Sequence, residues 1–385
     1  MIIKNGYIFT ESGSFQKGQI LIKENIIEKI ELSDVTETTD ENVDENMFDA
    51  GGMYVLPGFV DIHFHGASGA DFCDAADDTF AILEEYQMKN GVTTVFPATM
   101  TLAESTLQNI CEAAGEFVKN SSMGVIAGIT MEGPFISDGK KGAQNALYIR
   151  KPDVDFFQRI QKASQNLIRQ VAVAPEEDTG LEFISEVSKE VIVSLAHSVS
   201  DYETAKKAFM SGASHVTHLF NGMHPFSHRE PGIVGAAYDD QNVYVELICD
   251  GVHIHPSMVR AMFQLFGAKR ICMISDSMRA AGMPDGEYSL GGQKVFKNGN
   301  RATLEDGTIA GSVCNLYECF KKAVKEMQIP LEEAVLSCTK TPAKSLGVDD
   351  TCGILKEGRN ADILILDENL DIKYVIKCGK IIVNR

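Results

Sequence analysis

Residues 60–66 read VDIHFHG, a short apolar run that carries two histidines separated by one phenylalanine. Val, Ile and Phe around a single aspartate are typical of a buried β-strand. Successive side chains of a strand point to opposite faces, so His63 and His65 are expected on one face. Two imidazoles on one face can bind a metal ion, or they can be ordinary polar groups at a strand end. The spacing of the pair is compatible with both.

Seven further runs of this apolar, β-branched kind follow, at residues 93–99, 124–131, 168–175, 191–197, 214–220, 243–250 and 269–277. Helical periodicity lies between most of them, at 78–90, 103–120, 153–163, 181–190, 201–212 and 256–267, and again at 312–327. Eight alternations of strand and helix predict an α/β protein with a (β/α)8 TIM barrel. Two segments depart from the pattern: residues 223–242 show no clear helix, and residues 282–310 predict an inserted β-hairpin.

Both ends of the chain predict short antiparallel strands. Residues 2–10, 18–32, 48–58 and 361–384 alternate apolar and polar side chains, with turn-forming residues between the runs. Neither end is long enough to bury a core alone. We therefore expect residues 1–56 and 356–385 to form one small β-sandwich domain, and residues 57–355 to form the barrel.

The composition excludes several classes of partner. The chain has 385 residues and a formal net charge of −19, and an acidic surface repels nucleic acids and anionic membranes. No apolar run approaches the roughly 18 residues that a membrane span requires, and the N-terminus lacks the pattern of a signal peptide. Nine scattered cysteines without a CxxC pair indicate reduced thiols, so we expect a cytoplasmic protein.

Polar side chains that bind metals or transfer protons recur at the ends of the predicted barrel strands. Catalytic groups of such barrels lie at the carboxyl ends of the strands. Six of the eight predicted strands end in or lead to such a group, and the residues are His63 with His65, Glu132, His197, His218, His253 and Asp276. Each one alone can be a satisfied polar group at the barrel rim, but the whole set favours a metal site.

The donor types narrow the chemistry. Imidazole and carboxylate without thiolate suit Zn or Fe(II). A divalent ion lowers the pKa of bound water, and an aspartate beside that water can accept its proton and pass it to a leaving group. The sequence therefore predicts a metal-dependent hydrolase.

Longer motifs resemble the amidohydrolase superfamily. They are PGFVDIHFHG at 57–66 and GILKEGRNADILILD at 353–367. Within that superfamily the chain is similar to the N-acetylglucosamine-6-phosphate deacetylase family, in MEGPFI (131–136), HSVSDYETAKKA (197–208), THLFNGM (217–223), REPGIVGAAY (229–238), DGVHIHP (250–256), SDSMRAAG (275–282) and GTIAGS (307–312). The resemblance covers essentially the whole chain.

The resemblance implies a reaction and a site. The reaction is hydrolysis of the acetamide of an N-acetylated amino-sugar 6-phosphate, in amino-sugar catabolism. Core metal ligands fall on Glu132, His197 and His218, and the catalytic carboxylate falls on Asp276. Some members of the family lack the paired histidines and use one metal. Because this chain has both His63 and His65, we expect them to hold a second ion bridged by Glu132, so that two ions per chain are favoured over one.

The resemblance also implies substrate contacts. Arg229 matches a phosphate-binding arginine that reaches in from the neighbouring subunit, which predicts a homodimer. The other matching positions are Ala143, Asn221, Gly222, His253, Ile309, Ala310 and Gly311. His215, His224, His228 and His255 are assigned no role.

One position departs from the family pattern. Where members usually have KGxHN, this chain has Lys-Gly-Ala-Gln-Asn at 141–145, so Gln144 replaces a histidine that contacts the substrate. A glutamine amide still donates hydrogen bonds but carries no charge. We expect Gln144 to orient the substrate or its oxyanion as a neutral donor, with a slower rate or an altered substrate preference.

Three other functions compete with this one. The nearest is deacetylation of N-acetylgalactosamine 6-phosphate. A cyclic-amide hydrolase of the superfamily often uses a carbamylated lysine to bridge its metals, whereas here the third strand ends in Glu132. A scaffold protein on the same barrel would have lost ligands that this chain keeps.

Overall fold

The computed structural model describes residues 1–32 and 47–385. Within these residues a barrel of eight parallel strands is present, as predicted. The strands are β6 (Phe59–Phe64), β9 (Val92–Pro97), β10 (Ile129–Met131), β11 (Ile168–Val173), β12 (Ile192–Leu195), β13 (His215–Val216), β14 (Tyr244–Ile248) and β15 (Ile271–Ile274). Strands β10, β11, β12, β13, β14 and β15 form one hydrogen-bonded sheet in sequence order, and β6 pairs with β9. Isolated parallel bridges connect β9 and its end to the segment that contains β10. These strands are mostly buried and rich in apolar residues because both of their faces are covered.

The opening stretch of sequence closes the barrel. The N–H of Asp276 donates to the carbonyl of His63 (2.9 Å), and the N–H of His65 donates to the carbonyl of Ser277 (2.7 Å). The hydroxyl of Ser275 donates to the buried carboxylate of Asp61 at 2.6 Å. Burial raises the pKa of Asp61 to about 7, although these donors act in the opposite direction. The first and last barrel strands are therefore held together beside the predicted site.

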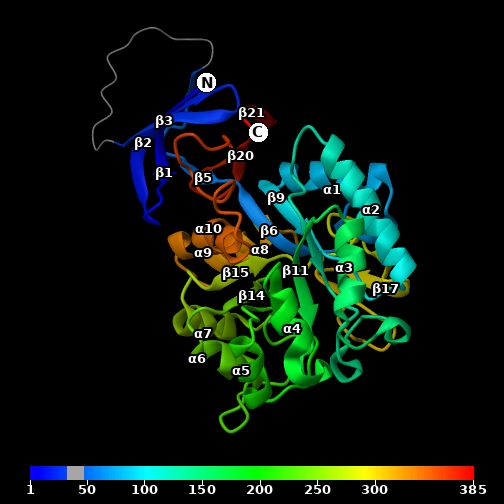
Figure 1. Cartoon of the computed structure of the whole chain (residues 1–385). Coiled ribbons are helices and arrows are strands. Elements are labelled where there is room, and N and C mark those ends of the chain that lie inside the picture. The colour runs from blue at the N-terminus through cyan, green and yellow to red at the C-terminus, as the bar shows by residue number, and fades with distance from the viewer. Residues whose placement is uncertain (33–46) are drawn as a thin grey trace.

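Helices cover the outside of the barrel (Figure 1). They are α1 (Asp77–Lys89), α2 (Glu104–Asn120), α3 (Val154–Ala163), α4 (Glu182–Val187), α5 (Tyr202–Met210), α6 (Gly232–Asp239), α7 (Pro256–Phe266) and α8 (Leu316–Lys325), followed by α9 (Leu331–Cys338) and α10 (Lys340–Ser345). Figure 1 shows α1 to α3 along one side of the strands and α5 to α7 along the other. Their apolar faces and the strands form the largest hydrophobic core of the described residues.

The prediction for residues 223–242 was wrong, because α6 lies within them. Residues 232–237 of this helix are all buried, so it lacks the polar face that produces a helical sequence pattern. Its two glycines also lower the intrinsic helix propensity. At Gly235 a Cβ would lie 2.4 Å from the Cβ of Pro231, so the close approach requires glycine. Helices α9 and α10 were not predicted either.

The insertion predicted at 282–310 is present and has one strand more than a hairpin. Strands β16 (Gly286–Leu290), β17 (Gln293–Asn298) and β18 (Arg301–Thr303) form an antiparallel sheet. Leu290, Val295 and Ala302 pack against Met100 in a small core of their own. A further two-stranded ribbon, β7 (Gly66–Ala67) with β8 (Ala70–Asp71), follows the first barrel strand.

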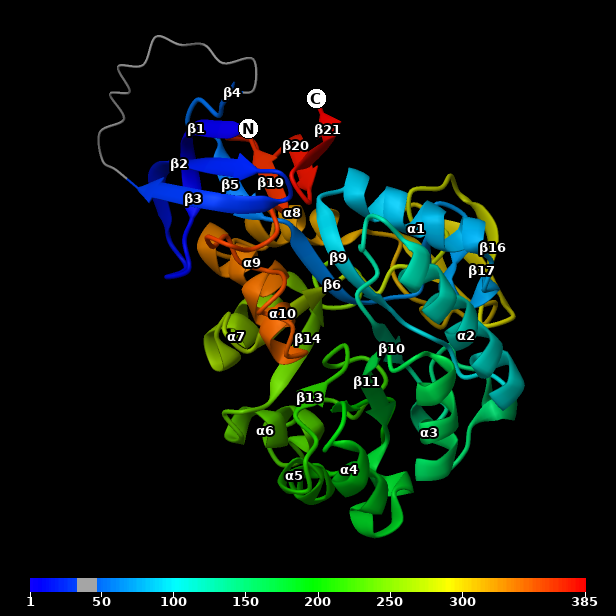
Figure 2. The same cartoon turned by 45° about the horizontal axis from the view of Figure 1, so that its top comes forward.

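The two ends of the chain share one sheet, as predicted. It contains β1 (Ile2–Phe9), β2 (Phe15–Lys23), β3 (Ile26–Leu32), β4 (Met47–Asp49), β5 (Tyr54–Pro57), β19 (Ile363–Leu366), β20 (Ile372–Lys377) and β21 (Lys380–Asn384). The order is β21-β20-β19-β5-β1-β2-β3, with β4 beside β1, and Figure 2 shows both termini at this sheet. The division into two packed layers of a sandwich, and the proposed domain bounds, stay predictions. Residues 33–46 of the N-terminal segment lie outside the described residues.

Two expectations from composition concern membrane spans and cysteines. No helix in residues 1–32 or 47–385 has the length and apolar character needed to cross a bilayer. All nine cysteines fall in this part of the chain, each is free, and most are buried.

Candidate metal centre

Two groups of potential metal ligands meet at the carboxyl end of the barrel. In each group one ligand atom per residue lies within 4.8 Å of the others: Glu132 with His197 and His218, and His63 with His65 and Asp276. All six side chains are buried. Among the described residues these are the only such groups, and they are the residues predicted from the sequence.

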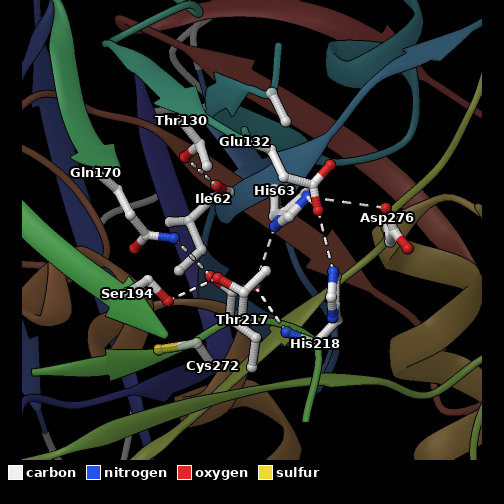
Figure 3. A network of polar contacts seen from close by, with 12 residues as sticks. Ile62, His63, Thr130, Glu132, Gln170, Ser194, Thr217, His218, Cys272 and Asp276 are labelled. Carbon is white, nitrogen blue, oxygen red and sulfur yellow. Dashed lines mark hydrogen bonds and ion pairs between the residues drawn. The ribbon is translucent and has the colours of Figure 1, made fainter. Parts of the chain in front are cut away.

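Glu132 stands between the two groups. Its Oε1 lies 3.0 Å from Nε2 of both His197 and His218. Oε2 lies 3.3 Å from Nε2 of His65, and Oε1 lies 3.6 Å from Nε2 of His63. Figure 3 shows His63, His218 and Asp276 directed toward this carboxylate. Oε1 thus faces His197, His218 and His63, and Oε2 faces His65, so this one carboxylate contacts both groups.

These side chains cannot satisfy one another with hydrogen bonds as well as a bound cation would satisfy them. Nδ1 of His197 lies 2.9 Å from the carbonyl of Lys140, and Nδ1 of His218 lies 3.1 Å from the carbonyl of Asn221. A carbonyl only accepts, so each Nδ1 carries a proton and each neutral ring has a lone pair on Nε2. These two Nε2 atoms lie 3.2 Å apart and face the same carboxylate oxygen. The buried Nε2 of His63 has no hydrogen-bond partner. A divalent ion would satisfy all of these lone pairs.

The electrostatics point the same way. Burial acts to raise the pKa of Glu132, but contacts with His197, His218 and His65 hold that pKa well below its ordinary value. Burial alone would lower the pKa of His63, yet the carboxylates around it, Glu246 first, raise its pKa to about 9. The pKa of Asp276 is lowered by its histidine neighbours against the effect of burial. The carboxylates are therefore ionised, and they concentrate negative charge where the ligand atoms meet.

Backbone strain accompanies three of the ligands. His197, His218 and Asp276 have φ angles of 43°, 30° and 47°, a region that non-glycine residues seldom occupy. Each follows a barrel strand. Such strain persists only where the surrounding structure enforces it, and it concentrates at functional sites. Glycine is required at position 222 for two reasons. Its φ is +62°, and a Cβ there would lie 2.9 Å from Nδ1 of His197.

A cavity of about 250 Å³ opens onto both groups. It brings together most of the predicted substrate contacts, which are Ala143, Gln144, Asn221, Gly222, His253, Ile309 and Gly311. Ala310 lies behind the wall in the core of the inserted sheet. Arg229 is exposed and borders a separate surface hollow with Asp201, so this single chain does not bring it to the cavity.

Sequence reasoning missed part of the wall. Met100, Leu290 and Thr308 also line the cavity. Leu290 ends β16, so the inserted sheet contributes an apolar contact above the metal ligands. Apolar side chains at a loop or strand end have no distinctive pattern, and only their position in space identifies them as lining residues.

The amide of Gln144 is fully engaged with the protein. Its Oε1 accepts the N–H of Thr101 at 2.7 Å, and its Nε2 donates to Oε2 of Glu132 at 2.6 Å. The same Nε2 has a second contact with the sulfur of Met100 at 3.7 Å. Gln144 therefore acts first on the shared carboxylate, and its expected role as a substrate donor stays a prediction.

His253 is the remaining predicted group. Its Nδ1 lies 2.7 Å from Oδ2 of Asp250, and its side chain is 5% exposed. Burial lowers the pKa of His253, but Asp250 and the more distant Asp276 raise it above the ordinary value overall. The ring faces the cavity with Nδ1 held by Asp250, which leaves Nε2 for a ligand.

Comparisons with known proteins agree with this geometry. The model of the amidohydrolase family matches residues 54–382. The chain is 34% identical to the N-acetylglucosamine-6-phosphate deacetylase of Bacillus subtilis (strain 168), over 99% of this chain and 96% of that protein. It is 31% identical to the N-acetylgalactosamine-6-phosphate deacetylase of Escherichia coli O157:H7, over 97% of each.

A solved structure extends the likeness to three dimensions. A mutant N-acetyl-D-glucosamine-6-phosphate deacetylase from Mycobacterium smegmatis, in complex with N-acetyl-D-glucosamine-6-phosphate, superimposes with a TM-score of 0.92 at 30% identity. The match covers 100% of this chain and 99% of that one. From its family match, its relatives and its fold, the chain belongs to the amidohydrolase family.

Proposed function

We propose that this protein hydrolyses the acetamide of N-acetyl-D-glucosamine 6-phosphate to D-glucosamine 6-phosphate and acetate. The observation that carries the proposal is the convergence of four histidines and two carboxylates beside one cavity, which all of them except His63 line. The relatives named above act on amino-sugar phosphates according to their names, which supports the substrate class.

The ligand roles follow from the donor set. Glu132, His197 and His218 would hold one divalent ion, and His63 and His65 a second, with Glu132 shared. Imidazole and carboxylate donors suit Zn or Fe(II). Such an ion supplies Lewis-acid polarisation and a lowered pKa for water.

Asp276 is the proposed proton carrier. It accepts a proton from the attacking water and delivers it to the amine nitrogen as the C–N bond breaks, so that water and amide become acetate and amine. Its position supports this role, because Oδ1 lies 3.4 Å from Nε2 of His65, within the ligand groups. Its depressed pKa keeps it ionised and ready to accept.

The sugar phosphate requires groups beyond the metal ligands. Asn221, Gly222 and His253 line the cavity and are proposed to contact the sugar, together with Ala143 and the 309–311 turn. The described residues place no arginine or lysine side chain in the cavity wall. We therefore propose a homodimer in which Arg229, on an exposed loop, binds the phosphate of the neighbouring active site.

The second candidate is N-acetylgalactosamine 6-phosphate, and the Escherichia coli relative favours it at 31% identity. Gln144, in place of the histidine usual in the family, is where a different preference would arise. A cyclic-amide hydrolase has less support, because the side chain between the two ligand groups is Glu132 and the described residues that line the cavity include no lysine.

The test combines metal content with product release. Protein purified without chelator is analysed for metal. Acetate is measured with both 6-phosphates and with unphosphorylated N-acetylglucosamine, and ring opening is measured with dihydroorotate. We expect bound divalent metal and acetate from N-acetylglucosamine 6-phosphate at the highest kcat/KM. A higher kcat/KM with N-acetylgalactosamine 6-phosphate would make that epimer the preferred substrate. Protein without metal and without turnover would refute the proposal.

A further inference from the structure

We propose that Glu246 is a positioning residue that holds ligands of both metal groups at once and thereby links their occupancy. The inference rests on the metal centre of the proposed function. It concerns a residue that touches neither cavity nor substrate and acts only through His63 and His218.

Glu246 lies in the middle of β14 and is completely buried. Its Oε2 lies 3.0 Å from Nδ1 of His63 and accepts the backbone N–H of His218 at 3.1 Å. Its Oε1 accepts from Nε2 of Gln170 at 2.8 Å and lies 3.4 Å from Nδ1 of His215. Figure 3 shows the side chains of His63, His218 and Gln170 below and beside Glu132.

The contact with His63 fixes which ring nitrogen is free. An ionised carboxylate only accepts, so Nδ1 of His63 carries a proton, and loss of the second ring proton leaves the lone pair on Nε2. That Nε2 is the buried atom without a partner, 3.6 Å from Glu132 and 3.8 Å from Asp276. A carboxylate on the far nitrogen orients a histidine ligand and increases its basicity toward a metal.

The contact with His218 acts on the other group. The hydrogen bond from its backbone N–H restrains the residue whose φ is 30° and whose Nε2 faces Glu132. The same oxygen of Glu246 therefore holds the ring of one ligand and the backbone of another. A displacement of this oxygen moves a ligand in each group.

Charge balance indicates more than a packing role. Barrel interiors are normally filled by apolar layers, and elsewhere in this one a neutral pair suffices, with the hydroxyls of Ser194 and Thr217 2.6 Å apart. A buried carboxylate is costly unless positive charge compensates it. In the described part of the chain Glu246 has ion pairs with His63 and His215 and with no lysine or arginine. Cations held by the ligand groups would supply the balance.

The decisive variant is Glu246→Gln, which removes the charge and keeps the shape. Oε1 of Gln170 has no partner, so its amide can rotate to accept from the new amide while the new carbonyl still accepts from His63 and His218. The two stepwise dissociation constants for Zn²⁺ are measured on metal-free protein with a competing chelator and no substrate. We expect both constants to rise, on the order of 10- to 100-fold.

Two control variants separate positioning from stability. Ser194→Ala removes a buried hydrogen bond of the same barrel interior without touching a ligand, and should lower the Tm of the metal-free protein but leave both constants unchanged. His65→Ala removes a ligand that Glu246 does not contact. Because His65 belongs to one group only, this substitution should weaken Zn²⁺ binding at one site only. The proposal would be overturned if Glu246→Gln left both constants unchanged, as Ser194→Ala should, or raised only one of them, as His65→Ala should.

A second route applies if Glu246→Gln does not fold. Gln170→Met removes one donor to Glu246 and contacts no ligand, and both constants should rise by a smaller factor. Unchanged constants in that variant would overturn the proposal. Wild-type protein that binds no Zn²⁺ would instead refute the metal centre itself, so the two failures are distinguishable.

Discussion

At the scale of single residues, the site depends on where each imidazole carries its proton. Backbone carbonyls fix Nδ1 of His197 and His218, and Nδ1 of His65 lies 3.3 Å from the carbonyl of Ala98. In the neutral ring the lone pair therefore lies on Nε2, directed at Glu132. The fold thus selects the tautomer of the neutral ring that can bind a metal.

The paired histidines are expected to determine the number of ions. Changing both His63 and His65 to alanine removes two Nε2 donors and leaves Glu132, His197 and His218 intact, so metal content should fall from about two ions per chain toward one. Elemental analysis of protein purified without chelator measures this. His255→Ala, at an exposed histidine that caps α7, is the control and should keep the wild-type content. Unchanged content in the double variant would make the pair ordinary polar groups of the rim.

Gln144 is expected to act through Glu132. Gln144→Ala removes the 2.6 Å donor to the carboxylate and leaves the buried N–H of Thr101 without an acceptor. Loss of such an outer partner typically costs 10- to 100-fold in activity or metal affinity. We expect kcat/KM on both epimers to fall by about that factor, with weaker Zn²⁺ binding.

Gln144→His is the comparison variant, because it restores the residue usual in the family. If Gln144→Ala lowers kcat/KM while Zn²⁺ affinity stays at the wild-type value, Gln144 works on the substrate instead. If kcat/KM itself is unchanged, neither role holds.

At the scale of elements, helices also complete the hydrogen bonding of the segments that lead into the strands. Glu84 of α1 is 5% exposed, and its Oε1 accepts the N–H groups of Val125 and Ile126 at 3.1 Å each. Its Oε2 accepts the hydroxyl of Ser121 at 3.1 Å. One carboxylate thereby anchors the entry to β10, the strand that carries Glu132.

Glu84→Ala should destabilise the protein. Two buried backbone N–H groups lose their acceptor, and each such loss costs about 1–3 kcal/mol, so we expect the free energy of unfolding to fall by about 3 kcal/mol. Urea denaturation measures it. The neighbouring Glu85 is exposed and pairs only with Lys89, so Glu85→Ala should change stability by less than about 0.5 kcal/mol. Equal effects of the two substitutions would contradict the anchoring role.

At the scale of the whole molecule, the cavity of one chain is short of cationic side chains, because the described residues that line it include no lysine or arginine. The net charge is −19, and Arg229 lies on an exposed loop outside the cavity, with one guanidinium nitrogen 2.6 Å from Nε2 of His228. A phosphate needs a cation, and a guanidinium presents two parallel donors to it. A second subunit would resolve the shortage.

Arg229→Ala is therefore expected to raise KM for the 6-phosphate substrate and leave metal content unchanged. Charged hydrogen bonds of about 1.5–3 kcal/mol correspond to a rise of about 10- to 100-fold. The control is Lys207→Ala, which removes an exposed cation of the adjacent helix α5 and should leave KM unchanged. Sedimentation establishes the oligomeric state, and a stable monomer with full activity would refute the shared site.

Much of the fold was predictable because parallel barrel strands are buried on both faces and read as uninterrupted apolar runs. All eight barrel strands follow from such runs, whereas the shared sheet of the two ends follows from apolar and polar alternation with turn residues. Helix α6 was missed because burial on every side removed its periodicity. The meeting of the six candidate side chains was predictable because strand ends of one barrel must meet at one mouth.

The sequence by itself determined which groups are present: four histidines and two carboxylates at strand ends, and a glutamine where the family usually has histidine. Only the tertiary structure decided how they act, since a hydrogen bond between Glu246 and His63 joins residues 183 positions apart. Glu246, within the apolar run 243–250, acquires its partners only when the barrel closes. The same holds for Asp61, where the first barrel strand meets the last. Chain closure brings such groups within 3 Å of each other, and that distance sets tautomer, charge and ligand direction.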